Sequence, residues 1–231
     1  MKTTIRVLLL LVLALVLSNC EKESEGLTYI TYYAEITLEG GIVTIPLNGT
    51  YTEPGYSGEE NEVDKTADVI VESNVDPSNI GVYSVEYSLE NSDGYSTNES
   101  RTVVVYDPSS PDDDFSGVYN TSIVRTESDG SNPRNHSGSA EITKLAPGFF
   151  YVSNLLGGIY SIDYGYGSAY AMTGYIVLNA DLTLSLVSSY VSGWGDGREG
   201  FQNGVYDDTT GLPYWESVYA GGDIYAVTCS K

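Results

Sequence analysis

The chain has 231 residues, with 32 Asp and Glu against 10 Lys and Arg, and a formal net charge of −22 at pH 7. Neutralising a nucleic-acid backbone needs many Lys and Arg, so this charge argues against a nucleic-acid partner. A single histidine, His136, and two cysteines are too few for a zinc site built on Cys and His. We therefore expect neither a metal site nor a cofactor.

The N-terminus has the pattern of a secretory signal peptide. Lys2 and Arg6 precede a run made only of Val, Leu and Ala at positions 7–17. This run is shorter than the roughly 20 apolar residues that a membrane-spanning helix needs. A basic segment followed by a short apolar one is instead typical of an export signal. The sequence predicts a signal peptide over residues 1–19.

Cys20 follows this signal directly. The segment Leu17-Ser18-Asn19-Cys20 resembles the lipobox of bacterial lipoproteins, although Asn19 departs from the small residue that usually precedes the cysteine. The resemblance implies that Cys20 is lipidated, and each acyl methylene buried in the membrane would contribute about 0.8 kcal/mol. Residues 20–28 would then be the lipid anchor and an acidic tether. Such a tether resembles the signal that sends Bacteroidetes lipoproteins to the outer membrane, facing the cell exterior; the alternative is a simple solvated linker.

Residues 29–107 have the pattern of short strands separated by turns. Apolar and aromatic residues alternate with polar ones over 81–89, which is the period of a half-buried strand. No segment with a helical period competes. Evenly spaced short strands favour an immunoglobulin-like sandwich. The expected strands lie at 29–38, 42–47, 67–72, 81–89 and 101–106.

A family resemblance supports the same fold. Residues 36–58, which include Tyr51-x-Glu53-Pro54-Gly55, and residues 79–94 and 101–107 resemble the immunoglobulin-like domains that follow the lipid anchor in many Bacteroidetes surface proteins. The resemblance implies a spacer or adhesion module and brings no catalytic residue.

A second domain is expected after a Pro, Ser and Asp linker at residues 108–114. Residues 115–231 are rich in Tyr and Gly, contain both tryptophans, and predict a small antiparallel β-barrel or sandwich. The segments DFSGVYNTS, GFFYVSNLLGGIY and YAGGDIYAVTCSK resemble the uncharacterised C-terminal β-domain of Bacteroidetes lipoproteins. The fold class is thus all-β in both domains. The expected strands of the second domain lie at 117–125, 139–144, 149–154, 170–178, 182–190, 200–206, 212–219 and 223–228.

Three aromatic residues are the candidate ligand contacts. Trp194 has glycine on both sides, and Tyr164 and Tyr166 lie in a similar glycine-rich segment. This pattern favours loops over strand interiors. Aromatic rings in loops can bind the apolar face of a sugar while nearby polar groups bind its hydroxyls. The alternative is that these rings fill the core or close the end of a barrel.

Catalytic and calcium-binding patterns are weaker. The lone His136 lies in a polar segment, 131–138, that we interpret as a solvated loop, and no nucleophile motif accompanies it. A glycosidase would need two facing carboxylates, for which Glu141, Asp163 and Glu216 are candidates. Acidic turns could bind calcium, but none has the spacing of a known calcium loop.

These observations favour a non-catalytic surface protein that binds glycans, like the accessory lipoproteins of polysaccharide-uptake systems. Its partners would be the membrane, through lipid on Cys20, a glycan, and outer-membrane uptake proteins. A structural or adhesive protein and a glycosidase stay open as alternatives. The segment 208–210, Asp-Thr-Thr, resembles an O-glycosylation motif of exported Bacteroidetes proteins, which marks Thr209.

Overall fold

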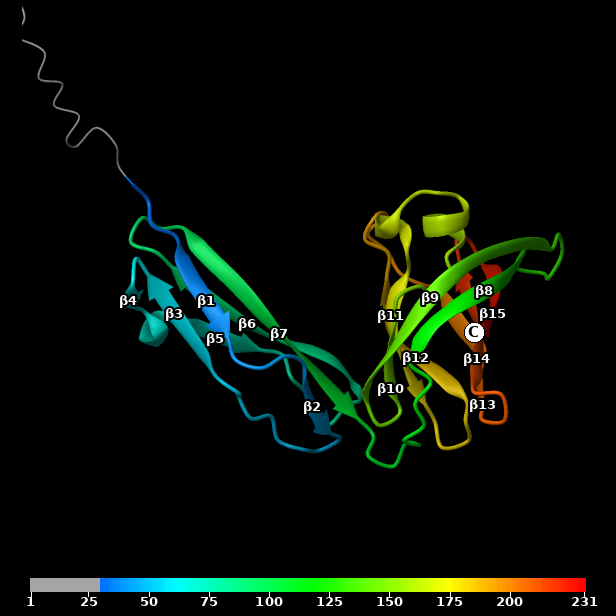
Figure 1. Ribbon diagram of the computed structural model, residues 1–231, viewed down its shortest axis with the longest axis horizontal. Helices are drawn as coiled ribbons and strands as arrows, with labels where there is room; N and C mark the ends of the chain where they lie inside the picture. The colour runs from blue at the N-terminus through cyan, green and yellow to red at the C-terminus, as the bar shows by residue number, and fades with distance from the viewer. Residues whose placement is uncertain (1–29) are drawn as a thin grey trace, which may run out of the picture.

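A computed structural model describes residues 30–231 of the chain, and it confirms the predicted all-β fold class (Figure 1). An immunoglobulin-like region comes first, and an eight-stranded, nearly closed barrel follows. The predicted signal peptide, Cys20 and the whole predicted tether lie outside the described residues. Within residues 30–231, no helix combines the length and the apolar character needed to cross a bilayer.

The first region packs a three-stranded sheet, in the order β1-β3-β4, against a four-stranded sheet, in the order β2-β7-β6-β5. Strands β2 and β7 pair in parallel, and all other pairs are antiparallel. Buried Val85, Tyr87, Leu89, Val103 and Val105 form the centre of the core. The strands are β1 (Ala34–Leu38), β2 (Val43–Pro46), β3 (Tyr56–Glu60), β4 (Val63–Asp64), β5 (Ile70–Ser73), β6 (Gly81–Glu90) and β7 (Ser96–Tyr106), with a short 3-10 helix η1 (Thr66–Asp68).

Strand β3 was missing from the sequence-based prediction because its inward face is not apolar. The buried positions of the strand are Gly58 and Glu60. Gly58 lies so close to the core that a Cβ atom there would be 2.7 Å from Val69. Glu60 is satisfied locally, since its carboxylate accepts hydrogen bonds from the backbone N–H and the hydroxyl of Ser92. These contacts, together with the packing of Tyr56 against Tyr87, hold the strand in place.

A buried arginine organises the polar part of this core. Arg101 is 2% exposed. Its Nη2 donates to Oε1 of Glu53 at 3.1 Å and to the Gly55 carbonyl at 2.8 Å. The hydroxyls of Tyr51 and Tyr87 donate to the other oxygen of Glu53. The Tyr51-x-Glu53-Pro54-Gly55 motif thus supplies two acceptors for the buried guanidinium, the Glu53 carboxylate and the Gly55 carbonyl, and Tyr51 holds Glu53 in place.

The second region is an up-and-down antiparallel barrel. Its strand order is β12-β11-β10-β9-β8-β15-β14-β13, and the edge strands approach each other through a Thr183–Val205 bridge. Each strand therefore lies beside its neighbours in sequence, and β8 pairs with β15. Near-closure leaves little exposed edge. The strands are β8 (Gly117–Thr126), β9 (Arg134–Ala146), β10 (Phe149–Val152), β11 (Thr173–Leu178), β12 (Leu184–Tyr190), β13 (Gly200–Asp207), β14 (Leu212–Tyr219) and β15 (Asp223–Ser230).

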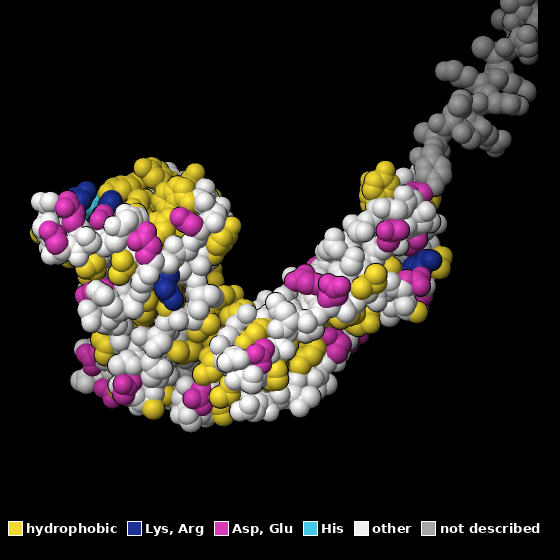
Figure 2. Space-filling model, turned by 180° about the vertical axis from the view of Figure 1, so that it is seen from behind, with side chains coloured by type: hydrophobic (Ala, Val, Ile, Leu, Met, Phe, Trp, Pro, Cys, Tyr) yellow, Lys and Arg dark blue, Asp and Glu magenta, His cyan; other side chains and the backbone are white. Residues whose placement is uncertain are grey.

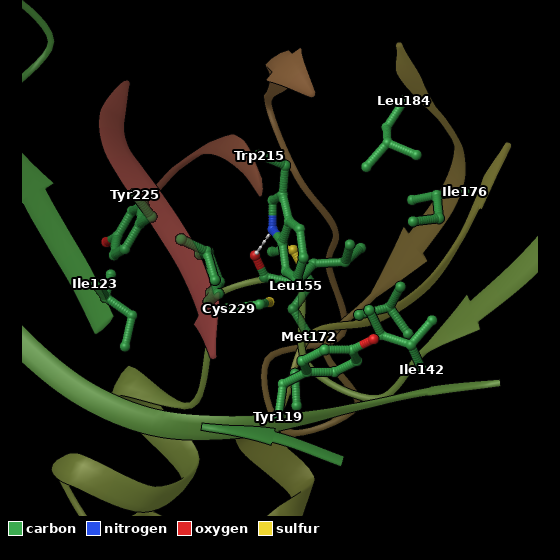
Figure 3. Packing of buried hydrophobic residues seen from close by; sticks show 14 of the residues in the cluster. Tyr119, Ile123, Ile142, Leu155, Met172, Ile176, Leu184, Trp215, Tyr225 and Cys229 are labelled. Carbon is green, nitrogen blue, oxygen red and sulfur yellow. Dashed lines mark hydrogen bonds between the residues drawn. The ribbon is translucent and has the colours of Figure 1, made fainter. Parts of the chain in front are cut away.

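Trp215 lies at the centre of the barrel interior (Figure 3). It is fully buried, and its indole Nε1 donates to the Leu155 carbonyl at 2.7 Å. Cys229 is 2% exposed in the same core, as expected for a small apolar residue on the face of Tyr225 and Val227. Burial raises the pKa of the Cys229 thiol to about 12, so the thiol is neutral and unreactive at pH 7.

The two regions share a small apolar interface. Val104 from β7 packs with Ala146 at the end of β9 and Phe149 at the start of β10, and all three are buried. The connecting segment is held as well, because Nζ of Lys144 contacts Oδ1 of Asp112 at 2.6 Å. The interface with the immunoglobulin-like region lies toward one end of the barrel, and the segment with the helical turns lies over the opposite end (Figure 1).

Candidate functional site

The end of the barrel away from the immunoglobulin-like region is covered by two segments that join its strands. One contains a single π-helical turn, η2 (Ile159–Asp163), and a short 3-10 helix, η3 (Ser168–Tyr170). The other is the turn at 191–199 between β12 and β13. The Gly193 N–H donates to the Ala169 carbonyl at 2.7 Å, and the Ser192 hydroxyl donates to the same oxygen. The two segments therefore form one surface.

This surface carries a cluster of rings that we call the aromatic cap. The structure brings the three predicted residues, Trp194, Tyr164 and Tyr166, together around Tyr160. The Tyr160 ring centroid lies 4.9 Å from that of Trp194, 5.6 Å from that of Tyr164 and 6.2 Å from that of Tyr166. Most of these contacts are edge-to-face, the arrangement that aromatic quadrupoles favour. The cap consists of Tyr160, Tyr164, Tyr166, Tyr170, Trp194 and Tyr219.

The three predicted residues are the exposed part of the cap. Tyr164 is 39% exposed, Tyr166 54% and Trp194 41%, whereas Tyr160 beneath them is 8% exposed. Hydrophobic side chains gather at this end of the domain in the space-filling view (Figure 2). Scattered exposed apolar residues are ordinary, but a contiguous patch of them marks an interaction surface.

Glycines explain how the turn presents Trp194. Gly193 contacts Tyr170 so closely that a Cβ atom would lie 2.7 Å from the ring, and Gly195 has a φ of +72° that side chains rarely adopt. These two positions let the turn pack flat against η3 and direct a large ring outward. The sequence-based placement of Trp194 in a loop is confirmed, and Trp215 is the tryptophan of the core.

Hydrogen bonds beneath the cap fix the positions of its lower rings. The hydroxyls of Tyr160 and Tyr225 lie 2.6 Å apart, and the guanidinium of Arg125 stacks over the Tyr225 ring. The Tyr219 hydroxyl donates to Oδ1 of Asp196 at 2.8 Å. Burial, and then the bond to Asp196, raises the pKa of Tyr219, so its hydroxyl stays a donor at neutral pH. The cap is therefore pre-formed.

The rim of the cap has polar groups. Nδ1 of His136 lies 2.6 Å from Oδ2 of Asp163, and its ring meets Tyr164 edge-on at 5.4 Å. The interpretation of His136 as a solvated loop residue is wrong. It belongs to β9, and its side chain is 11% exposed because η2 folds over it. The polar sequence around it concealed a strand that extends beyond the barrel core.

The carboxylates considered for catalysis lie on different elements. Glu141 is exposed on β9, Asp163 ends η2, and Glu216 lies on β14. Asp163 contacts His136, whereas Glu216 accepts hydrogen bonds from Tyr214, Gln202 and Asn203. Over residues 30–231, no group of three His, Cys, Asp or Glu side chains could hold a metal ion. Thr209 is exposed in the β13–β14 turn, where its N–H donates to Asp207.

Sequence reasoning missed the supporting residues of the cap. Tyr160 and Tyr170 lie in the segment that joins β10 to β11, whereas Tyr219 ends β14, and only the barrel brings the two parts of the chain together. A usable signal was the density of tyrosines in residues 160–170, which is unusual for a segment without strand alternation. Tyr219 gave no such signal, because it lies in a regular strand, β14.

Comparisons with known proteins agree with this two-part architecture. A family model described as a bacterial surface protein Ig-like domain matches residues 36–105, and one described as a C-terminal domain matches residues 108–231. The crystal structure of the lipoprotein BT2262 from Bacteroides thetaiotaomicron is 32% identical, covering 86% of this chain and 100% of that one, with a TM-score of 0.48. The chain belongs to the same family as this lipoprotein, and its first region matches a domain of bacterial surface proteins.

More distant similarities add no functional argument. A structure from Clostridium perfringens ZmpB, CBM51-2 in complex with GlcNAc together with INT domains, is 17% identical over 52% of this chain and 29% of that one, with a TM-score of 0.28. A second ZmpB structure, of the M60 catalytic domain with CBM51-1 and CBM51-2, is 16% identical over 54% of this chain and 14% of that one, with a TM-score of 0.31. No curated protein matches the sequence.

Proposed function

We propose that this protein is a lipid-anchored, non-catalytic glycan-binding protein of the cell surface. The observation that carries the proposal is the exposed aromatic cap, in which Trp194, Tyr164 and Tyr166 surround one buried tyrosine. Such rings offer an apolar face to a sugar, and hydroxyl and carboxylate groups nearby can bind its hydroxyls. A pre-formed surface also loses little conformational entropy on binding.

The position of the cap supports this role. The cap lies at the end of the barrel opposite to the contact with the immunoglobulin-like region (Figure 1). A ligand on the cap would therefore not meet the other domain. The immunoglobulin-like region acts as a spacer in this arrangement, and outer-membrane uptake proteins are the partners we propose for a captured glycan.

The two alternatives receive less support. A purely structural protein gives no reason for an exposed ring cluster whose lower rings are fixed by hydrogen bonds. An adhesive protein would bind another protein through the same surface, and the glycan array distinguishes that role from glycan binding. A glycosidase needs two carboxylates on either side of one bond. Glu141, Asp163 and Glu216 lie on separate elements, and the carboxylates of Asp163 and Glu216 have different partners.

A glycan array tests the proposal directly. The soluble chain 21–231 should bind at least one glycan class, and Tyr166→Ala should reduce the signal at least tenfold, because that ring is a main exposed contact. Tyr95→Ala is the matched control, since Tyr95 is also 54% exposed but lies in the immunoglobulin-like region. Binding that both variants reduce equally, or no binding by the wild-type chain, would contradict the proposal.

Mass spectrometry of the native protein tests the proposed anchor and modification. The N-terminal peptide should begin at Cys20 and carry acyl chains. The Cys20→Ala variant should be absent from the membrane fraction, because one thiol carries the attachment.

We also propose that Thr209 is O-glycosylated, so the native protein should carry hexoses that the Thr209→Val variant lacks. An unmodified Cys20 with cleavage elsewhere would disprove the anchor, and an unchanged mass for Thr209→Val would disprove the glycan.

A further inference from the structure

Two buried side-chain nitrogens have no hydrogen-bond partner, one at the rim of the aromatic cap and one in the turn that carries Trp194. Within residues 30–231, Nε2 of His136 and Nε of Arg198 are the buried side-chain atoms that lack a hydrogen bond. His136 contacts Tyr164, and Arg198 follows Trp194 by four residues in the same turn. Nε2 of His136 is a donor or an acceptor depending on the tautomer, whereas Nε of Arg198 is always a donor. Because buried polar groups almost always find partners, the exception at Arg198 points to a missing acceptor beside this turn.

Arg198 also lacks a counter-ion. Of the seven Lys and Arg in the described residues, five lie within 4.0 Å of a carboxylate. A sixth, Lys231 at the end of the chain, lies over the Tyr119 ring. Only Arg198 has neither contact, although the chain carries 32 acidic residues.

The acidic neighbours of Arg198 are engaged elsewhere. Asp196 accepts the hydroxyl of Tyr219, and Glu199 accepts the backbone N–H of Gly221. The backbone of Arg198 is itself fixed, since its N–H donates to the Ser189 hydroxyl at 3.1 Å. Arg198 as a whole is half-buried, and its two terminal guanidinium nitrogens make no hydrogen bond or ion pair within residues 30–231, so they are free to bind a ligand.

We propose that Arg198 binds a carboxylate of the glycan held on the aromatic cap, so that the ligand is an acidic polysaccharide. This inference rests on the proposed function. An arginine fork binds a carboxylate through two parallel hydrogen bonds, which gives both affinity and orientation. The net charge of −22 repels an acidic glycan at long range, so a local cation is needed for such a ligand to bind.

The experiment compares carboxylated polysaccharides with their methyl esters, which keep the sugar backbone but lose the charge. Polygalacturonate, hyaluronan and polysialic acid are the probes, and affinity electrophoresis of chain 21–231 is the measurement. We expect the wild-type chain to bind at least one of them ten times or more tighter than its methyl ester. Arg198→Gln should reduce binding of the acid form to that of the ester. Lys65→Gln, which makes the same change in charge in the other region, should leave both unchanged.

Each outcome has a distinct meaning. Equal binding of acid and ester forms, unaffected by Arg198→Gln, would overturn the assignment of Arg198 while the glycan-binding function stands. A preference for the acid form that Arg198→Gln does not change would likewise overturn it. Failure of the wild-type chain to bind any of these polysaccharides or any glycan on the array would overturn the proposed function and this inference together.

Discussion

Trp194→Ala is expected to weaken glycan binding by about 2 kcal/mol, the loss typical of an aromatic hot spot, which is roughly 30-fold in Kd. The indole is 41% exposed and is the largest ring of the aromatic cap. Its contacts with Tyr160 and Tyr170 are edge-to-face pairs at 4.9 Å, so their loss should reduce the free energy of unfolding by about 1 kcal/mol. Affinity and melting temperature should be measured on the same preparation.

Trp215→Ala is the matched control for this experiment. Trp215 is fully buried, and its Nε1 donates to the Leu155 carbonyl (Figure 3). Its removal should reduce the free energy of unfolding by about 3–5 kcal/mol, because a large cavity replaces a packed ring. If Trp194→Ala were as destabilising as Trp215→Ala, Trp194 would be a core residue. If Trp194→Ala changed neither the stability nor the affinity for the glycan, the aromatic cap would not be the binding surface.

Arg101→Met is expected to reduce the stability of the immunoglobulin-like region by about 3 kcal/mol or more, because it leaves buried polar groups without their partner. The guanidinium contacts Glu53, the Glu39 and Gly55 carbonyls and the Tyr87 hydroxyl. Urea unfolding followed by far-UV circular dichroism should detect the loss. The urea transition followed by tryptophan fluorescence should not shift between wild type and Arg101→Met, because both tryptophans lie in the barrel.

Arg134→Met serves as the control, since Arg134 is 49% exposed and lies 3.9 Å from Glu127. Exposed pairs of this kind contribute about 0–1 kcal/mol. If the two variants were equally stable, the buried network would not be what holds this region together.

The same network predicts a loss of stability in acid. Burial alone would raise the pKa of Glu53, but hydrogen bonds from Tyr51 and Tyr87, the Gly55 N–H and the Arg101 charge outweigh it and lower that pKa. Because the folded pKa lies below the unfolded value of about 4.3, the stabilisation is complete above that pH and declines as pH falls through the folded pKa. Glu53→Gln should flatten this part of the stability profile. An equal acid response in wild type and Glu53→Gln would assign it to other carboxylates.

The sequence was sufficient to predict most strands because their chemistry is local. Alternating residues in β6, and tyrosine- and valine-rich strands between glycine turns in the barrel, give a period of two that needs no tertiary knowledge. The position of Trp194 was also predictable, because flanking glycines permit a turn that a core residue would not need. Strand β3 could not be predicted in this way. Its buried positions are Gly58 and Glu60, and their burial depends on contacts with Val69 and Ser92 from elsewhere in the chain.

The binding surface itself was decided by the tertiary structure. Sequence alone determined which aromatic residues stand in loops and that the chain is strongly acidic. Closure of the barrel placed Tyr160, Tyr219 and Trp194 side by side, and folding of η2 over β9 converted His136 from an apparent loop residue into a partner of Asp163. The lack of a partner for Arg198 is likewise a property of the fold. Contacts between residues far apart in the chain depend on how strands are ordered, and neither composition nor spacing encodes that order.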